Sequence, residues 1–206
     1  VAAKDNLTSE YFHLPGSNLP NLPKSTAPYY YDWLNHPEYD EYWQRISIED
    51  SHHKISTPAI NFGGWYDVFL GGTIRNFVGM SKNGATEDAR RGQRLVIGPW
   101  IHGGSPISVS GQYNFGTNAA SGTIDVMGRT LRYYDHWLKN KDNGVSEEPP
   151  VNIFVMGSNV WRYENEWPPE RAKPTKYFLD SKGKANTLNG DGSLRVDKTG
   201  QDPPDI

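Results

Sequence analysis

The chain has 206 residues, with 21 Lys and Arg against 24 Asp and Glu, which gives a net charge of -3. This length fits one large domain or two small ones, and the 13% of aromatic residues supply enough apolar surface to exclude a disordered chain. No basic run is longer than Arg90-Arg91, and no stretch approaches the roughly 20 apolar residues that span a bilayer. We therefore expect neither nucleic acid nor membrane as a partner. The absence of cysteine excludes disulfides and a cysteine nucleophile.

The first 30 residues contain four prolines among polar side chains, which is typical of an extended segment with little regular structure. Residues 29–48 differ, because apolar side chains recur there at helical spacings that Pro37 interrupts. These side chains are Trp33, Leu34, Tyr39, Tyr42, Trp43 and Ile46. We expect one or two short helices whose aromatic rings pack against a core rather than contact a ligand.

The middle of the chain predicts a strand, a helix and a second strand. Short apolar runs at 58–62 and 94–97 are typical of buried strands, and each is followed by glycine-rich turns. A helical period connects them and ends near Asn83-Gly84; it is formed by Leu70, Thr73, Ile74, Phe77 and Val78. This order implies parallel strands joined by a right-handed crossover.

The second half begins with a polar loop at 103–122 and a long amphipathic helix. Its expected apolar face consists of Ile124, Met127, Leu131, Tyr134 and Leu138. Beyond a Pro-Pro linker, the segments 151–157 and 175–180 alternate with period two. We therefore expect a domain boundary near residue 146, with an antiparallel β domain after it.

Two residues that can carry chemistry follow the two predicted parallel strands. Asp67 comes after the first strand and His102 after the second, so both are expected at the carboxyl edge of the sheet, where ligands bind. A carboxylate beside a histidine fixes its tautomer and stabilises the imidazolium form. Asp before His is also the order of an α/β-hydrolase triad, in which the nucleophilic serine comes first. No Gly-x-Ser-x-Gly motif occurs in the 206 residues, so the pair by itself fits a structural hydrogen bond equally well.

Several segments resemble, in fixed order, the cocaine esterase and X-Pro dipeptidyl-peptidase-like family of serine acyl hydrolases, which includes α-amino acid ester hydrolases and glutaryl-cephalosporin acylases. The resemblance covers about residues 29–206. The segments that carry it are NFGGWYDVFLGGTIRNF, RLVIGPWIHGG, YYDHWLKNKDNGVSEEPPVNIFVMGSNVWRYENEWPP and KANTLNGDGSL.

The resemblance implies a mixed α/β protein made of three parts. Residues 1–48 would be the end of a helical cap, 49–145 the second half of an α/β-hydrolase core, and 146–206 the start of a C-terminal β jelly roll. The chain starts without Met and stops after strand and turn signals, so we expect a fragment. Its partners would be the missing N-terminal half of the enzyme, a small acyl ester, amide or peptide substrate, and a second copy in a homo-oligomer.

The resemblance also implies site roles. Asp67 would be the orienting carboxylate and His102 the general acid and base, with the serine and the oxyanion hole supplied from upstream. Family members that select an α-amino group resemble one another in carrying acidic residues just after the aspartate. Here Phe69 and Leu70 stand there, which favours an aromatic or aliphatic acyl group, and Trp65 is a further candidate for the substrate pocket. Ordinary core packing remains an alternative for all three. We expect no cofactor.

A second hypothesis, of a different class, remains open from the sequence. The chain could instead be a non-catalytic binding or scaffold module whose β-rich tail contacts carbohydrate or a partner subunit; the absence of a nucleophile favours this hypothesis.

The pair His52-His53 has no further ligand at a suitable spacing, so we expect a solvated turn there and no metal site.

Overall fold

The computed structural model describes residues 12–103 and 108–197, which divide into a compact unit up to Glu164 and a second unit from Asn165. None of the helices in these ranges is long and apolar enough to cross a membrane. The elements are, in chain order, α2 (Pro28–Asn35), α3 (Glu41–Gln44), η1 (Glu49–Lys54), β1 (Ile60–Tyr66), α4 (Leu70–Asn83), α5 (Glu87–Arg91), β2 (Arg94–Ile101), β3 (Val109–Ser110), β4 (Tyr113–Asn114), η2 (Thr117–Ala119), α6 (Val126–Lys139), η3 (Val145–Glu147), β5 (Val151–Val155), β6 (Val160–Glu164), β7 (Phe178–Asp180) and β8 (Ser193–Arg195).

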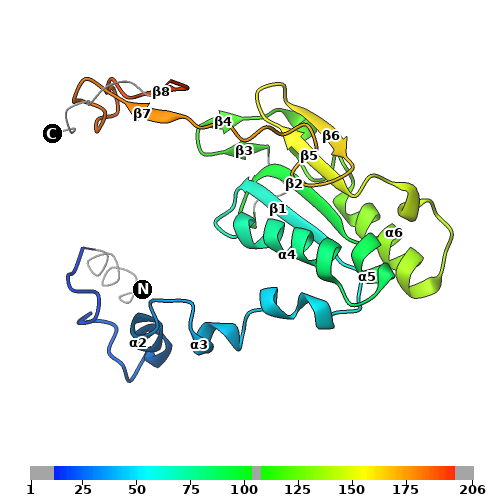
Figure 1. The fold of residues 1–206 in the computed structure, drawn as a ribbon, viewed down its shortest axis with the longest axis horizontal. Coiled ribbons are helices and arrows are strands. Elements are labelled where there is room, and N and C mark those ends of the chain that lie inside the picture. The colour runs from blue at the N-terminus through cyan, green and yellow to red at the C-terminus, as the bar shows by residue number, and fades with distance from the viewer. Residues whose placement is uncertain (1–11, 104–107, 198–206) are drawn as a thin grey trace. The chain divides into compact units, whose positions relative to one another are not determined.

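The first unit is built on a four-stranded sheet with the order β1-β2-β5-β6 (Figure 1). Strands β1, β2 and β5 are parallel, and β6 returns antiparallel to β5. The expected strand, helix and parallel strand are confirmed as β1, α4 and β2. Helix α4 ends at Asn83, as its glycine stop signal predicts. The sheet therefore places the ends of β1 and β2 side by side.

Apolar side chains cover the sheet on both faces. On the side of α4, Phe77 and Met80 are buried. Elsewhere Phe115 and Ala119, from the loop region between β2 and α6, form a cluster with Phe154 of β5, and Trp161 packs against it. Strand β2 is buried along nearly its whole length, as expected for a central strand of a parallel sheet.

The sheet continues past the boundary expected near residue 146. Strand β5 pairs in parallel with β2 through partners such as Leu95 and Val151, so the segment 151–164 belongs to the first compact unit. The expected boundary and the observed sheet differ because period-two alternation identifies a strand but does not identify the strand with which it pairs. The antiparallel partner of β5, strand β6, covers the exposed edge of the parallel sheet.

The long helix is confirmed as α6, but the apolar face expected from the spacing is not buried in the described structure. Met127, Leu131, Tyr134 and Leu138 are all exposed, with Leu138 at 75%. Tyr133 is buried instead, and its hydroxyl donates to the carbonyl oxygen of Gly92 at 3.0 Å. The spacing rule missed this face because a tyrosine that buries its ring can satisfy its hydroxyl with a backbone carbonyl.

The aromatic segment near the N-terminus forms two short helices on either side of Pro37, as expected. Its rings contact one another: Tyr29 lies 5.1 Å from Trp33 between ring centroids, and Tyr42 stacks on His36 at 4.4 Å. The Nδ1 atom of His36 lies 2.5 Å from Asp40. No residue of α2 or α3 is buried, so within the described structure these rings form a local cluster instead of packing into a core.

His52 is a correction to the expectation of a solvated turn. It lies in η1 with only 4% of its surface exposed, and its Nε2 is 3.2 Å from the side-chain oxygen of Asn76 on α4. The ring fits because Gly79 has no side chain: a Cβ there would lie 2.2 Å from His52 Nδ1. A small residue on a neighbouring helix thus decided the burial.

The second unit contains the antiparallel pair β7 and β8. The expected strand at 175–180 is shorter than predicted and spans Phe178–Asp180. Asp191, in the loop between the strands, accepts hydrogen bonds from the backbone N–H groups of Lys182 and Lys184. An ion pair between Arg195 and Asp180 joins the two strands.

Candidate active site

Asp67 and His102 lie side by side at the carboxyl ends of β1 and β2. The register pairs Tyr66 with Ile101, so the residue that follows each strand emerges at the same edge of the sheet. Gly64 makes this approach possible, because a Cβ there would lie 2.1 Å from the carbonyl oxygen of Trp100. The two backbones therefore come closer here than any side chain on Gly64 would allow.

The side chains of the pair are hydrogen-bonded. His102 Nδ1 lies 3.2 Å from Asp67 Oδ2, and the other carboxylate oxygen accepts from the backbone N–H of Phe69 at 2.8 Å. The Phe69 N–H and, more weakly, His102 hold the pKa of Asp67 below its usual value, against the opposing effect of burial. Asp67 is therefore a carboxylate at neutral pH, oriented on both oxygens.

His102 presents its second ring nitrogen to the surroundings. Its side chain is 68% exposed, whereas that of Asp67 is 16% exposed. Within the described residues, Nε2 of His102 has no hydrogen-bond partner, and the edge-to-face contact with Phe69, at 5.1 Å between ring centroids, supports the ring from one side. An imidazole held by a carboxylate at Nδ1 and open at Nε2 can accept a proton at Nε2.

A cavity of about 220 Å³ lies beside the pair. Asp67 and His102 contribute to its wall, and the other lining residues are mostly apolar or glycine: Phe62, Gly63, Gly64, Trp100, Ile101, Gly103 and Val126. A largely apolar space with a few polar groups is typical of a small-molecule site.

None of the three predicted substrate-binding residues lines this cavity. Trp65 donates its indole N–H to the carbonyl oxygen of Phe154 at 2.7 Å, so that its polar atom ties β1 to β5. Leu70 approaches Gly63, where a Cβ would lie 3.0 Å from its Cδ1. Phe69 is exposed and contacts His102.

The site residues predicted from the sequence do not include several cavity residues, among them Phe62, Ile101 and Val126. Ile101 is the last residue of β2, a position that could have signalled it, whereas Phe62 stands in the first half of β1. Val126 had no such signal, because the loop before α6 brings it to the cavity. No group of three acidic or histidine side chains in the described ranges is arranged to hold a metal ion.

A parallel βαβ unit with an acid and an imidazole at the strand ends is typical of hydrolases with an α/β fold. Two solved structures share the fold. One is an aminopeptidase from the marine sediment archaeon Thaumarchaeota archaeon, with a TM-score of 0.66 and 21% identity over 85% of this chain and 29% of that chain. The other is an α-amino acid ester hydrolase, with a TM-score of 0.55 and 22% identity over 72% of this chain and 25% of that chain.

The sequence comparisons identify the family. The model of the X-Pro dipeptidyl-peptidase (S15 family) matches residues 14–104, and that of the X-Pro dipeptidyl-peptidase C-terminal non-catalytic domain matches residues 143–206. Cocaine esterase of Rhodococcus sp. (strain MB1 Bresler) is 33% identical over 172 residues, 84% of this chain. The chain belongs to the family of serine hydrolases that contains cocaine esterase and X-Pro dipeptidyl-peptidases.

The chain is much shorter than these relatives. It spans 29% of cocaine esterase, and 19% of a proposed serine esterase of Mycobacterium bovis that is 30% identical over 146 residues, 68% of this chain. The 206 residues thus correspond to less than a third of either protein.

Proposed function

We propose that this chain supplies the acid and the base of a Ser-His-Asp triad in a serine hydrolase that cleaves esters or amides. The hydrogen bond between His102 Nδ1 and Asp67 Oδ2, at the carboxyl ends of adjacent parallel strands, carries this proposal. The chain order supports it, as do the neighbouring cavity and the Nε2 of His102, which has no partner among the described residues.

In the proposed reaction, His102 Nε2 accepts the proton of a serine hydroxyl while the serine oxygen attacks the substrate carbonyl. Asp67 remains ionised and accepts the N–H of Nδ1, which stabilises the imidazolium. His102 then donates the proton to the leaving alcohol or amine, and an acyl-enzyme forms. Water, deprotonated by His102, attacks the acyl-enzyme and releases the acid together with the free serine.

The serine and the oxyanion hole would come from residues outside this chain, since no Gly-x-Ser-x-Gly motif occurs in it. On this proposal the 206 residues alone have no hydrolase activity. The matched C-terminal family model, which ends at residue 206, and the separate unit from Asn165 support assigning the residues after β6 to the start of a jelly roll. Residues 1–48 would be the end of a cap.

The acyl group would be aromatic or aliphatic. Phe69 and Leu70 place no carboxylate beside Asp67, and the cavity wall contains Phe62, Trp100 and Val126. An apolar wall stabilises an apolar acyl group and leaves a charged ammonium without a partner. The preferred substrates are therefore small acyl esters or amides without a free α-amino group.

The test is an assay of the full protein that contains this chain, with p-nitrophenyl acetate, butyrate and benzoate. His102→Ala should lower kcat by about 10⁴-fold, and Asp67→Asn by a similar factor. Because His102 is largely exposed, the melting temperature should change little. His53→Gln and Asp88→Asn, which replace exposed residues away from the cavity, are matched controls that keep full activity.

Full activity of His102→Ala together with unchanged folding contradicts the triad assignment. In that case the alternative of a binding or scaffold module becomes the better hypothesis for these residues. A preference for substrates with a free α-amino group leaves the triad intact and contradicts only the proposal for the acyl pocket.

A further inference from the structure

Strand β1 has a free edge. It forms one border of the four-stranded sheet: β2 pairs with one side of it, and no described strand pairs with the other. Arg94 donates its backbone N–H to the carbonyl oxygen of Ala59, and in a parallel pair every second residue bonds to the neighbouring strand. The backbone N–H groups of Ile60 and Phe62 therefore point away from β2. Because parallel strands are normally covered, a free edge of this kind calls for a partner.

Helix α6 carries an apolar stripe that is exposed in the described structure. Its members are Met127, Leu131, Tyr134 and Leu138, which are 70%, 59%, 48% and 75% exposed. Single exposed hydrophobic residues are normal on a protein surface, whereas a row of four large ones marks a surface that another part of a protein covers.

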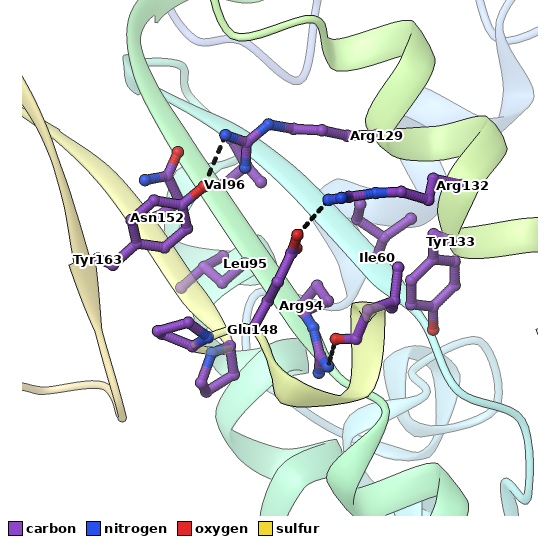
Figure 2. A pocket seen from close by; sticks show the side chains of 13 residues that line it. Ile60, Arg94, Leu95, Val96, Arg129, Arg132, Tyr133, Glu148, Asn152 and Tyr163 are labelled. Atoms are coloured by element: carbon purple, nitrogen blue, oxygen red, sulfur yellow. Dashed lines mark hydrogen bonds and ion pairs between the residues drawn. The ribbon is translucent and has the colours of Figure 1, made fainter. Parts of the chain in front are cut away.

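The stripe is turned away from β6. At about 100° per residue, its four side chains lie about 100 to 160° round the helix from the buried Tyr133, and Arg129 and Arg132 lie on the other side of Tyr133. Figure 2 shows these two arginines extending from α6 toward Tyr163 of β6 and Glu148, to which they bind. The stripe therefore lies on the side of α6 opposite to these contacts.

Both ends of α6 lie near β1. Val126, its first residue, and Phe62 of β1 line the same cavity. Near the other end, a Cβ on Gly92 would lie 2.6 Å from the ring of Trp137 and 2.5 Å from Pro58, which precedes β1. The stripe and the free edge of β1 thus belong to one flank of the first unit.

The described strands after β6 are too short to complete this flank. Strands β7 and β8 have three residues each, whereas β1 has seven and α6 has 14. Cocaine esterase is long enough to hold further strands and helices, since this chain spans 29% of it. A strand parallel to β1 would also end at the same edge of the sheet as Asp67 and His102, where the serine of the proposed triad must stand.

We propose that the free edge of β1 and the α6 stripe form one docking surface for the serine-bearing part of the hydrolase. That part adds a strand parallel to β1, bonded to the N–H groups of Ile60 and Phe62, and covers the stripe with apolar side chains. The identity of this partner rests on the proposed function, since only a triad requires a serine from outside the chain. The surface itself rests on exposure and strand pairing.

The test is the reactivity of single cysteines toward N-ethylmaleimide, because the 206 residues contain no cysteine of their own. Leu131→Cys and Leu138→Cys place the thiol on the stripe, and Arg91→Cys places it on α5, where the arginine side chain is 81% exposed. In the full protein that contains this chain, both stripe thiols should react at least about tenfold more slowly than the thiol on α5. In the 206-residue chain alone, all three should react within about threefold of one another.

A second measurement follows hydrogen exchange at the edge of β1. The amides of Ile60 and Phe62 should exchange at least about 100-fold more slowly in the full protein than in the 206-residue chain, because each gains a strand partner. Leu95 is the control: its N–H already donates to the carbonyl oxygen of Pro150, so its exchange should change less.

Equal reactivity of the three thiols in the full protein overturns the proposal. Slow reaction of the stripe thiols in the 206-residue chain also overturns it: a second copy covers the stripe if dilution restores the rate, and the chain covers its own stripe if dilution does not. Neither measurement needs catalysis. Full activity of His102→Ala beside protected stripe thiols would therefore contradict the triad and leave the docking surface standing.

Discussion

The two ends of strand β2 treat charge in opposite ways. At the carboxyl end, His102 is 68% exposed, pairs with a carboxylate and faces a cavity of about 220 Å³. At the amino end, Arg94 is 7% exposed, and its hydrogen bonds in the described structure go to carbonyl oxygens, beside a cavity of about 30 Å³. The two ends of one strand thus hold an exposed ionisable side chain and a buried one.

The difference shows how the burial of an ionisable group decides whether it can exchange protons or instead contributes to stability. An exposed imidazole can gain and lose a proton at little cost to folding, which suits acid–base chemistry. A buried guanidinium keeps its charge, so its surroundings must compensate that charge, and its removal affects stability. Replacing the ionisable group His102 should therefore alter activity more than stability, and replacing the ionisable group Arg94 should alter the free energy of unfolding.

The largest effect on stability is expected where the two strands come closest. In Gly64→Ala the new Cβ would lie 2.1 Å from the Trp100 carbonyl oxygen, so the strands must separate. We expect a loss of about 3 kcal/mol in the free energy of unfolding, and a longer distance between Asp67 and His102. Urea denaturation measures the first, and a structure of the variant the second.

Gly72→Ala is the matched control, because nothing lies within 4 Å of a Cβ at this exposed position of α4. Alanine should stabilise the helix by about 0.5 to 1 kcal/mol. Equal effects of the two substitutions would show that close strand approach does not limit Gly64.

The amino end of β2 is tested by Arg94→Met, which keeps most of the side-chain volume but leaves carbonyl groups such as that of Val145 without a donor. We expect a loss of about 2 kcal/mol. Arg91→Met is the control: its side chain is 81% exposed and pairs with Glu87, so the change should stay within about 0.5 kcal/mol. Equal losses in the two variants would remove the contrast between the ends of β2.

A smaller effect is expected for Tyr133→Phe. Burial raises the pKa of the Tyr133 hydroxyl, against the effect of the Arg94 charge, so the group is neutral and acts as a hydrogen-bond donor to Gly92. Losing this bond should cost about 1 kcal/mol in urea denaturation. Tyr134→Phe, at an exposed position on the same helix, should cost less; the reverse order contradicts the assigned face of α6.

The smallest expected effect is a pH dependence at the carboxyl end. The folded state lowers the pKa of Asp67, so its carboxylate stabilises the fold at pH values above its ordinary pKa, and this stabilisation is lost as the pH falls through the lowered value. The difference in unfolding free energy between the parent chain and Asp67→Asn should be constant above about pH 5 and shrink below about pH 4. A difference that grows in acid contradicts this direction.

The local signals in the sequence predicted much of the fold. The apolar run at 94–97 and the helical period that begins at Leu70 identify β2 and α4, because burial of apolar side chains dominates in both. The same rule failed for α6, where the exposed face holds Leu131 and the buried face holds Tyr133. Pattern reasoning ranks residues by polarity, whereas the structure also satisfies a hydroxyl through Gly92.

Reasoning from periodicity and chain order predicted only part of the candidate site. Asp67 and His102 follow strands whose parallel pairing the chain order implies, so their closeness could be predicted. Two other features could not be predicted: the approach of Val126 to the cavity and the burial of His52 against Gly79. Each depends on a neighbouring residue that no periodicity indicates.

The sequence by itself determined the α/β class, the strand and helix that carry Asp67, and the strand that precedes His102, because these follow from periodicity and chain order. Only the tertiary structure decided that β5 joins β2 and that Arg94 is buried beside a cavity. Pairing and burial depend on which surfaces meet, and residues far apart in the chain supply those surfaces.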